Sequence, residues 1–316
     1  MMARILARRI GGAVAALLVA SVVVFFLLRV LPGDAATVAL GVNATPDALE
    51  AWRVAHGTDY PLITQYLFWM DGLVMLDFGT SFVTGRPITP LVLDRVQVTL
   101  IIVLAGLALA LLIAVPLGVL AALRQRSWLG ALVTGASQVG VAVPAFLMGL
   151  LLIALFAVRL GWLPAGGWLP PAFGFGEFLR RAALPVLTLG LVQAAILTRY
   201  VRSAVLEQLG QDYLRTARAQ GLTQAQALRR HGLRNAAIPV LTILGVQFAA
   251  LLVGAVVVER VFLVPGIGSL LVDSVANRDL QAVQGIVMVL VVIVLAVNLL
   301  TDLLYTALDS RVRELP

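Results

Sequence analysis

Arginine is the side chain with the most chemistry to offer in this sequence. All 23 basic residues are arginine, cysteine is absent, and the only histidines are His56 and His231. Without lysine the chain has no nucleotide-binding P-loop and no Schiff-base lysine, and without cysteine it has no thiol nucleophile or thiolate metal site. A guanidinium group does bind carboxylates and carbonyl oxygens through a rigid fork of donors. The composition therefore favours a binding role over an enzyme, with no catalytic residues and no metal site.

The arginines gather in the polar segment 213–239, which begins inside an amphipathic pattern. Apolar residues recur there at three- and four-residue steps, which predicts one stripe of a helix; they are Leu206, Leu209, Tyr213 and Ala217. Arg215 and Arg218 lie off this stripe. Gly221 follows at the place where helices commonly end in a left-handed turn, which glycine adopts at little cost.

A second short helix is predicted directly after that turn. Thr223 and Gln226 have the spacing of a capping box, in which the hydroxyl accepts from the backbone of residue 226 and the glutamine reaches back. The helix is expected to run through Arg230 and to end at Gly232. Pro239 then lies near the start of the next apolar run.

Three interpretations of this segment are open. Its arginines could do no more than fix the membrane topology and contact anionic lipid. A helix-turn-helix that binds DNA is the second, but a segment this short lacks a supporting domain, so we expect no nucleic-acid partner. The third is docking of another protein. Because topology alone needs neither a capped second helix nor a glycine at the turn, we favour docking.

The rest of the sequence predicts an all-α polytopic membrane protein. Hydrophobic residues make up 61% of the chain and the mean hydropathy is +1.01. Six apolar runs are long enough to cross the hydrocarbon core of a bilayer; they are 10–30, 98–123, 129–158, 183–201, 237–258 and 283–307. The first is expected to be an uncleaved helix and not a signal peptide. Pro116 and Pro144 fall inside runs and are expected to kink the helices without breaking them.

The distribution of arginine predicts the orientation of these spans. The amino terminus, the loop with Arg124 and Arg126, the segment from Arg199 to Arg234 and the carboxyl tail together hold 14 arginines and four acids, whereas the opposite side holds nine arginines and eleven acids. Arginine marks the cytoplasmic side, so both termini and the segment 203–236 are expected there. Segment 32–97 is then extracytoplasmic, with a capped helix after Thr45 and an interfacial helix over 60–75. With no internal repeat, residues 1–316 are expected to form a single transmembrane domain.

Several stretches carry a resemblance to a known family. Arg215-Thr216-Ala217 followed by Gly221 resembles the E-A-A-x-x-x-G signature of permease subunits of bacterial ABC importers, with Arg215 in place of the glutamate as in the dipeptide, oligopeptide and nickel branch. Similar stretches are LLRVLPGDAA (27–36), FGTSF (78–82), LGWLPAGG (160–167), RNAAIPV (234–240), VERVFLVPGIGSLLVDSV (258–275), RDLQAVQG (278–285) and YTALDSRVR (305–313). The short amino terminus that leads into FFLLRVLPGD is similar to the B-type subunit of that branch.

The resemblance implies a type I ABC importer permease fold in the bacterial inner membrane, with six transmembrane helices and both termini in the cytoplasm. The implied partners are the lipid bilayer, a C-type permease subunit in a heterodimer, two ATPase subunits and an extracytoplasmic solute-binding protein. ATP and Mg are expected on the ATPase subunits, so this chain needs no cofactor. The implied function is ATP-driven uptake of di- or oligopeptides. Nickel and opines stay open as substrates, because the binding protein sets that choice.

The resemblance also assigns roles within the polar segment. Its second helix is the coupling helix, which lies in a groove of the ATPase and passes the motion of the ATPase to the spans. The docking residues carried over in this way are Tyr213, Arg215, Thr216, Ala217, Gly221, Thr223, Gln226, Arg229, Arg230 and His231. Tyr213 and Ala217 are expected to pack the two helices together, while the arginines pair with acidic or carbonyl groups of the partner.

Polar residues well inside the spans are candidates for lining the pathway. Such groups usually face protein or water instead of lipid; they are Gln138, Gln193, Gln247 and Asn298. Hydrogen bonding between helices is the competing interpretation. A secondary, ion-coupled transporter is the alternative class of function. It would need a buried ionisable site, whereas Glu259 and Asp302 fall near the ends of predicted spans.

Overall fold

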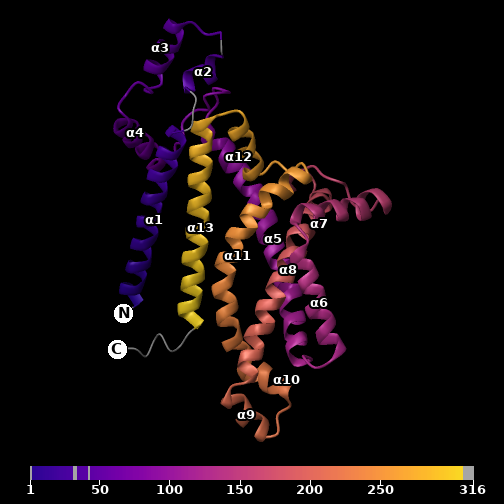
Figure 1. The fold of residues 1–316 in the computed structure, drawn as a ribbon. Coiled ribbons are helices and arrows are strands. Elements are labelled where there is room, and N and C mark those ends of the chain that lie inside the picture. The colour runs from indigo at the N-terminus through magenta and orange to yellow at the C-terminus, as the bar shows by residue number, and fades with distance from the viewer. Residues whose placement is uncertain (1, 31–33, 42, 309–316) are drawn as a thin grey trace. The chain divides into compact units, whose positions relative to one another are not determined.

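The computed structural model describes residues 2–30, 34–41 and 43–308, and every regular element in these ranges is a helix (Figure 1). The chain divides into two compact units. The first comprises Met1–Val98 and Gly266–Leu299, and the second comprises Thr99–Pro265 and Leu300–Pro316. Two long helices, α5 (Ile88–Leu123) and α13 (Leu280–Leu308), contribute residues to both.

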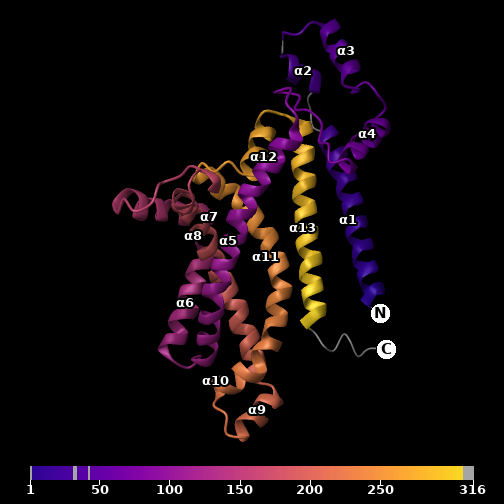
Figure 2. The ribbon, with the colours of Figure 1, turned by 180° about the vertical axis from the view of Figure 1, so that it is seen from behind.

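The first unit combines long apolar helices with short capped ones. Its other helices are α1 (Met2–Val30), α2 (Ala35–Leu40), α3 (Pro46–Ala55), α4 (Leu62–Val74) and α12 (Ile267–Ala276). Figures 1 and 2 show α1 beside α13, and Phe25, Trp69 and Met288 form a buried cluster between α1, α4 and α13. The predicted cap at Thr45 is present, because its hydroxyl accepts from the Ala48 N–H at 3.3 Å.

The second unit holds the remaining helices. They are α6 (Trp128–Ala142), α7 (Ala145–Leu152), the π-helix η1 (Ile153–Arg159), the 3-10 turn η2 (Pro171–Phe173), α8 (Phe175–Leu209), α9 (Asp212–Ala219), α10 (Gln224–Ala227), the π-helix η3 (Leu228–Gly232) and α11 (Leu233–Val261). Both views show α9 and α10 together at one end of α8 and α11.

Within the described residues, five helices are long and apolar enough to span a membrane, and a sixth span would be a bent pair. The predicted run 183–201 lies inside the longer helix α8. The predicted span ends where the apolar residues end, but helix α8 continues into polar sequence on both sides. There Glu177 accepts a hydrogen bond from Arg181 at 2.9 Å, a favourable spacing of four residues on a helix.

The predicted run 129–158 is broken in the structure. Helices α6 and α7–η1 meet at an angle of 103°. Val143, the residue before Pro144, has an extended backbone (ψ 117°) because the proline ring disfavours a helical residue in front of it. The expectation that Pro144 only kinks its helix is therefore wrong. Pro116, by contrast, lies inside the unbroken helix α5, as expected.

Candidate functional site

The polar segment forms two helices joined at Gly221. Helix α9 ends at Ala219, and Gly221 has the predicted left-handed backbone, with φ +96°. A Cβ at this position would meet nothing within 4 Å, so the turn needs glycine for its backbone conformation and not for space. Most L-residues would pay about 1–2 kcal/mol for that conformation, and Asn or Asp somewhat less.

The capping box that starts α10 is present as predicted. The Thr223 hydroxyl accepts from the Gln226 N–H at 3.3 Å, and Gln226 Oε1 accepts from the Thr223 N–H at 2.9 Å. These two bonds satisfy two backbone donors that the first turn leaves without helical partners. They fix the direction in which α10 leaves the Gly221 turn.

The predicted end of the second helix at Gly232 is wrong. Helix α10 passes through the π turn η3 into α11, so that one helical span runs over Gln224–Val261. Gly232 has a packing role instead. A Cβ there would lie 2.8 Å from Leu228 Cδ1 and 3.2 Å from Leu214 Cδ1, so glycine lets α9 pack closely against this turn.

A small apolar core holds α9 and α10 against α8. Its centre consists of Leu214, Ala217, Ala227 and Leu228, which pack with Val201 and Val205. The expectation for Ala217 agrees with this core, but Leu214 is the buried residue of the preceding turn and Tyr213 is 37% exposed. Sequence reasoning missed Leu214 and Leu228. Their spacing to Ala217 and Ala227 was the available signal, but Tyr213 fitted the three- and four-residue steps as well.

Tyr213 contributes hydrogen bonds between helices and not apolar packing. Its hydroxyl donates to Gln208 Oε1 at 2.7 Å and accepts from Asn235 Nδ2 at 3.3 Å. These bonds connect α9 to the end of α8 and to the start of α11. The helix pair is thus attached at both its apolar and its polar side.

The outward face of the pair is basic. Arg215, Arg218, Arg229, Arg230 and His231 are all exposed. Arg215 pairs with Asp212 at 3.3 Å within α9, and both side chains are largely in solvent, so this pair adds little stability. An open hollow of about 510 Å³ is lined by Arg215, Arg218, Ala219, Leu222, Thr223 and Gln224. Its two guanidinium groups suit an acidic side chain of another protein.

The four predicted pathway residues separate into two kinds. Gln193 is buried and donates to Gln247 Oε1 at 2.8 Å, which is a hydrogen bond between α8 and α11. Gln138 and Asn298 are exposed in this chain. The buried acid Glu259 accepts from the Thr99 hydroxyl at 2.5 Å, so an acidic residue near the end of α11 lies deeper in the protein than its position in the sequence indicated.

Two of the recognised sequence stretches contact each other in the first unit. Asp279 accepts from the Ser81 hydroxyl at 2.5 Å and from the Phe82 N–H at 3.3 Å. Gln281 Nε2 donates to the Phe78 carbonyl at 3.2 Å. The stretches FGTSF and RDLQAVQG, far apart in the sequence, therefore form one structural joint.

Known proteins resemble the chain along its whole length. Residues 114–314 match the binding-protein-dependent transport system inner membrane component, and residues 2–103 match the N-terminal part of such components. A Brucella melitensis protein with the provisional name of a peptide transport system permease is 37% identical over 99% of both chains. The glutathione transport system permease protein GsiC of Escherichia coli K12 is 37% identical over 97% of both.

Solved structures confirm the fold class. The inward-facing MetNI methionine ABC transporter matches with a TM-score of 0.58 at 20% identity, covering 69% of this chain and 96% of that one. An amino acid ABC transporter determined with histidines matches with a TM-score of 0.51, also at 20% identity, covering 69% and 94%. The resemblance found in the sequence is confirmed by the family matches: the chain belongs to the binding-protein-dependent transport system inner membrane components.

Proposed function

We propose that this chain is one of two permease subunits of a peptide importer, and that α9 and α10 dock a separate ATPase. The coarser role follows from the family: the chain is a non-catalytic membrane permease of a binding-protein-dependent ABC importer. Such an importer also has a binding protein, an ATPase and a partner permease. A secondary transporter is not supported, because the family works with an ATPase.

The observation that supports the docking proposal is a row of exposed basic residues on α9 and η3 directly beside a buried apolar core. Arg229 and Arg230 are exposed, whereas the two residues directly before them, Ala227 and Leu228, are each 1% exposed. Because a packed core deforms little, motion of a docked ATPase would pass through α9 and α10 to the helices behind them. The arginines supply charge-assisted hydrogen bonds to the ATPase.

The composition of the complex is proposed from the B-type sequence features. The second permease is a C-type subunit in a heterodimer, each permease binds one of two ATPase subunits, and ATP and Mg are held by those subunits. Gln138 and Asn298 keep a proposed role in the pathway, since a partner permease or a water-filled channel would cover them. Gln193 and Gln247 are better explained by the bond between them.

Peptide is the substrate class that the relatives favour. The names of the relatives refer to peptide and to glutathione, which is itself a short peptide. Nickel and opines are the remaining candidates, since substrate choice rests with a binding protein. Uptake of labelled dipeptide, oligopeptide, nickel and opine by cells with and without this gene separates them. Uptake of nickel alone would contradict the peptide proposal.

Docking is tested by co-purification. The double variant Arg229→Ala/Arg230→Ala removes two exposed guanidinium groups without touching the apolar core beneath them. We expect retention of the ATPase on the purified permease to fall by about tenfold, because each charge-assisted bond is worth about 1.5–3 kcal/mol before losses to solvent. Quantitative mass spectrometry of the purified complex measures this retention.

Arg180→Ala is the matched control. Its side chain is 58% exposed and lies in the same unit, but at the far end of α8 from α9. This variant should retain the ATPase at the unaltered level. If both variants behave alike, the basic face of α9 and α10 is not the docking surface.

A further inference from the structure

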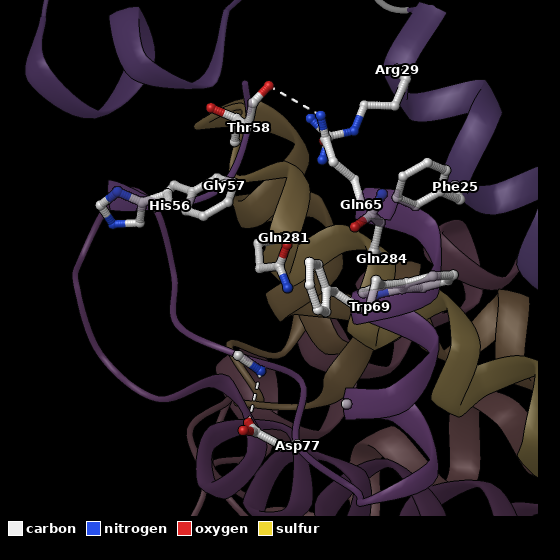
Figure 3. A pocket seen from close by; sticks show the side chains of 14 residues that line it. Phe25, Arg29, His56, Gly57, Thr58, Gln65, Trp69, Asp77, Gln281 and Gln284 are labelled. Atoms are coloured by element: carbon white, nitrogen blue, oxygen red, sulfur yellow. Dashed lines mark hydrogen bonds between the residues drawn. The ribbon is translucent and has the colours of Figure 1, made fainter. Parts of the chain in front are cut away.

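A polar cavity lies in the first unit at the carboxyl end of α1 (Figure 3). Its volume is about 250 Å³. Residues of α1, of α4, of the 77–82 loop and of α13 line it, and the family assignment gives it no role. Figure 3 shows Phe25, Arg29, Gln65 and Trp69 on one side of it and His56 on the other.

The side chain of Gln65, which lines this cavity, has an amide oxygen that accepts no hydrogen bond. Its amide nitrogen donates to the carbonyls of Thr58 at 3.0 Å and of Tyr60 at 2.7 Å. The reverse orientation would set the amide oxygen against two carbonyl oxygens, so the orientation of the amide is fixed. The oxygen, Gln65 Oε1, is buried and has no hydrogen-bond partner. It can therefore accept from an N–H or O–H group of a ligand.

Two donors without acceptors lie beside it. Arg29 Nε and Trp69 Nε1 are both buried and without a partner. The same ring, Phe25, positions both, because the guanidinium carbon lies 5.3 Å from the centre of the Phe25 ring and the Trp69 ring lies 5.6 Å from it. A buried donor without an acceptor costs about 1–3 kcal/mol, so both call for an acceptor group in the cavity.

The depth of Arg29 identifies the source of such a group. Arg29 closes the candidate span Ala7–Arg29, and the two apolar residues Phe26 and Leu27 just before it are 37% and 63% exposed. Exposed apolar residues on a spanning helix face lipid tails, so an arginine at the end of that helix lies at the level of the headgroups. Phosphate oxygens are the abundant acceptors at that level.

We propose that this cavity binds the zwitterionic headgroup of a phospholipid whose ammonium group keeps its N–H donors, as in phosphatidylethanolamine. The phosphate accepts from Arg29 and Trp69, and the ammonium group donates to Gln65 Oε1. Because all three atoms are fully buried in this structure, small rotations of their side chains must open them to the cavity before one ligand can satisfy them. It also ties α1 to α4, the two helices that bring them together.

Competitive lipid retention tests the site. The full chain, purified with the subunits that accompany it, is placed in nanodiscs containing equal parts of phosphatidylethanolamine, phosphatidylcholine and phosphatidylglycerol, then released into mild detergent. Native mass spectrometry counts the lipids that remain bound. We expect one phosphatidylethanolamine to be retained over phosphatidylcholine, because choline has no N–H, and over phosphatidylglycerol, because a neutral hydroxyl makes a weaker hydrogen bond to Gln65 Oε1 than an ammonium group does. The variants Arg29→Gln and Trp69→Phe should each weaken its retention by about tenfold.

Controls separate this proposal from its competitors. Arg86→Gln removes an exposed charge of the same unit away from the cavity and should leave retention unchanged. Trp69→Phe keeps the aromatic packing, so it remains informative if Arg29→Gln fails to insert. Equal retention of the three lipids, or retention that neither variant changes, overturns the proposal and leaves a cavity filled by water. Binding of soluble glycerophosphoethanolamine without retention of the lipid would make the source a free solute and overturn the lipid assignment.

Discussion

Single polar residues in this chain serve mainly to join backbone segments. Asp34 is a clear case, because it caps α2 through Thr37 and also accepts from Arg53 of α3 at 2.8 Å. Asp279 in the first unit and Tyr213 in the second do the same with other partners.

The joint at Asp34 makes a prediction about pH. The hydrogen bond from Arg53 lowers the pKa of the Asp34 carboxyl below its ordinary value, helped by the bond from Thr37. Stability from this joint is therefore fully present above the unfolded-state pKa of about 3.9, and it is lost as the pH falls through the lower folded-state value. We expect Asp34→Asn to lower the Tm by a few degrees at most above about pH 5, since the pair is partly in solvent.

Thermal unfolding in detergent across the acidic range measures that effect. The difference in Tm between the unaltered protein and Asp34→Asn should shrink as the pH falls. In a chain that carries Arg53→Gln, the change from Asp34 to Asn should lower the Tm by less over the same pH range, because the partner of Asp34 is already missing. A difference that stays constant from neutral to strongly acidic pH would show that the charge of Asp34 does not contribute.

Helix boundaries divide into those set locally and those set by packing. The Gly221 turn, the Thr223 capping box and the Thr45 cap could be predicted, because each depends on residues within one turn of chain. The continuation of α10 into α11 could not, since it depends on Leu214 and Leu228 meeting at Gly232. Tyr213 and Leu214 fit the same pattern of apolar residues, and only the position of α8 decides between them.

The Gly221 turn gives a prediction for this pair of helices. Gly221→Asp places a side chain at φ +96°, which should strain the turn by at most about 1–2 kcal/mol and misdirect α10. Membrane insertion should stay intact and ATP hydrolysis should continue, while solute uptake falls by about tenfold. Uptake and hydrolysis are measured together in proteoliposomes.

Gly161→Asp is the matched control for that variant. Gly161 also has a positive φ, of +65°, and a Cβ at this position would meet nothing within 4 Å, so this variant adds the same side chain to a left-handed backbone outside α9 and α10. Uptake should remain close to normal. Unchanged uptake in Gly221→Asp would instead remove the turn from the coupling mechanism.

At the scale of the whole molecule, hydrogen bonds join segments that are remote in the sequence within each of the two units. The FGTSF and RDLQAVQG stretches fit each other within the first unit, and α8 and α11 exchange a hydrogen bond within the second. The resemblance located these stretches, but only the folded chain shows that two of them touch.

The orientation of the molecule in the membrane is open to direct measurement because the chain has no cysteine. Val54 in α3 is 59% exposed, and Gln220 at the end of α9 is exposed as well. In spheroplasts, a membrane-impermeant maleimide should label Val54→Cys and leave Gln220→Cys unlabelled, because the arginine-rich connections stay in the cytoplasm. Inverted vesicles should give the opposite pattern.

Each variant must still support uptake, so that the labelled protein is the working one. Labelling of Gln220→Cys in spheroplasts would put α9 and α10 on the outer side, where no ATPase could reach them, and the docking proposal would fail with it.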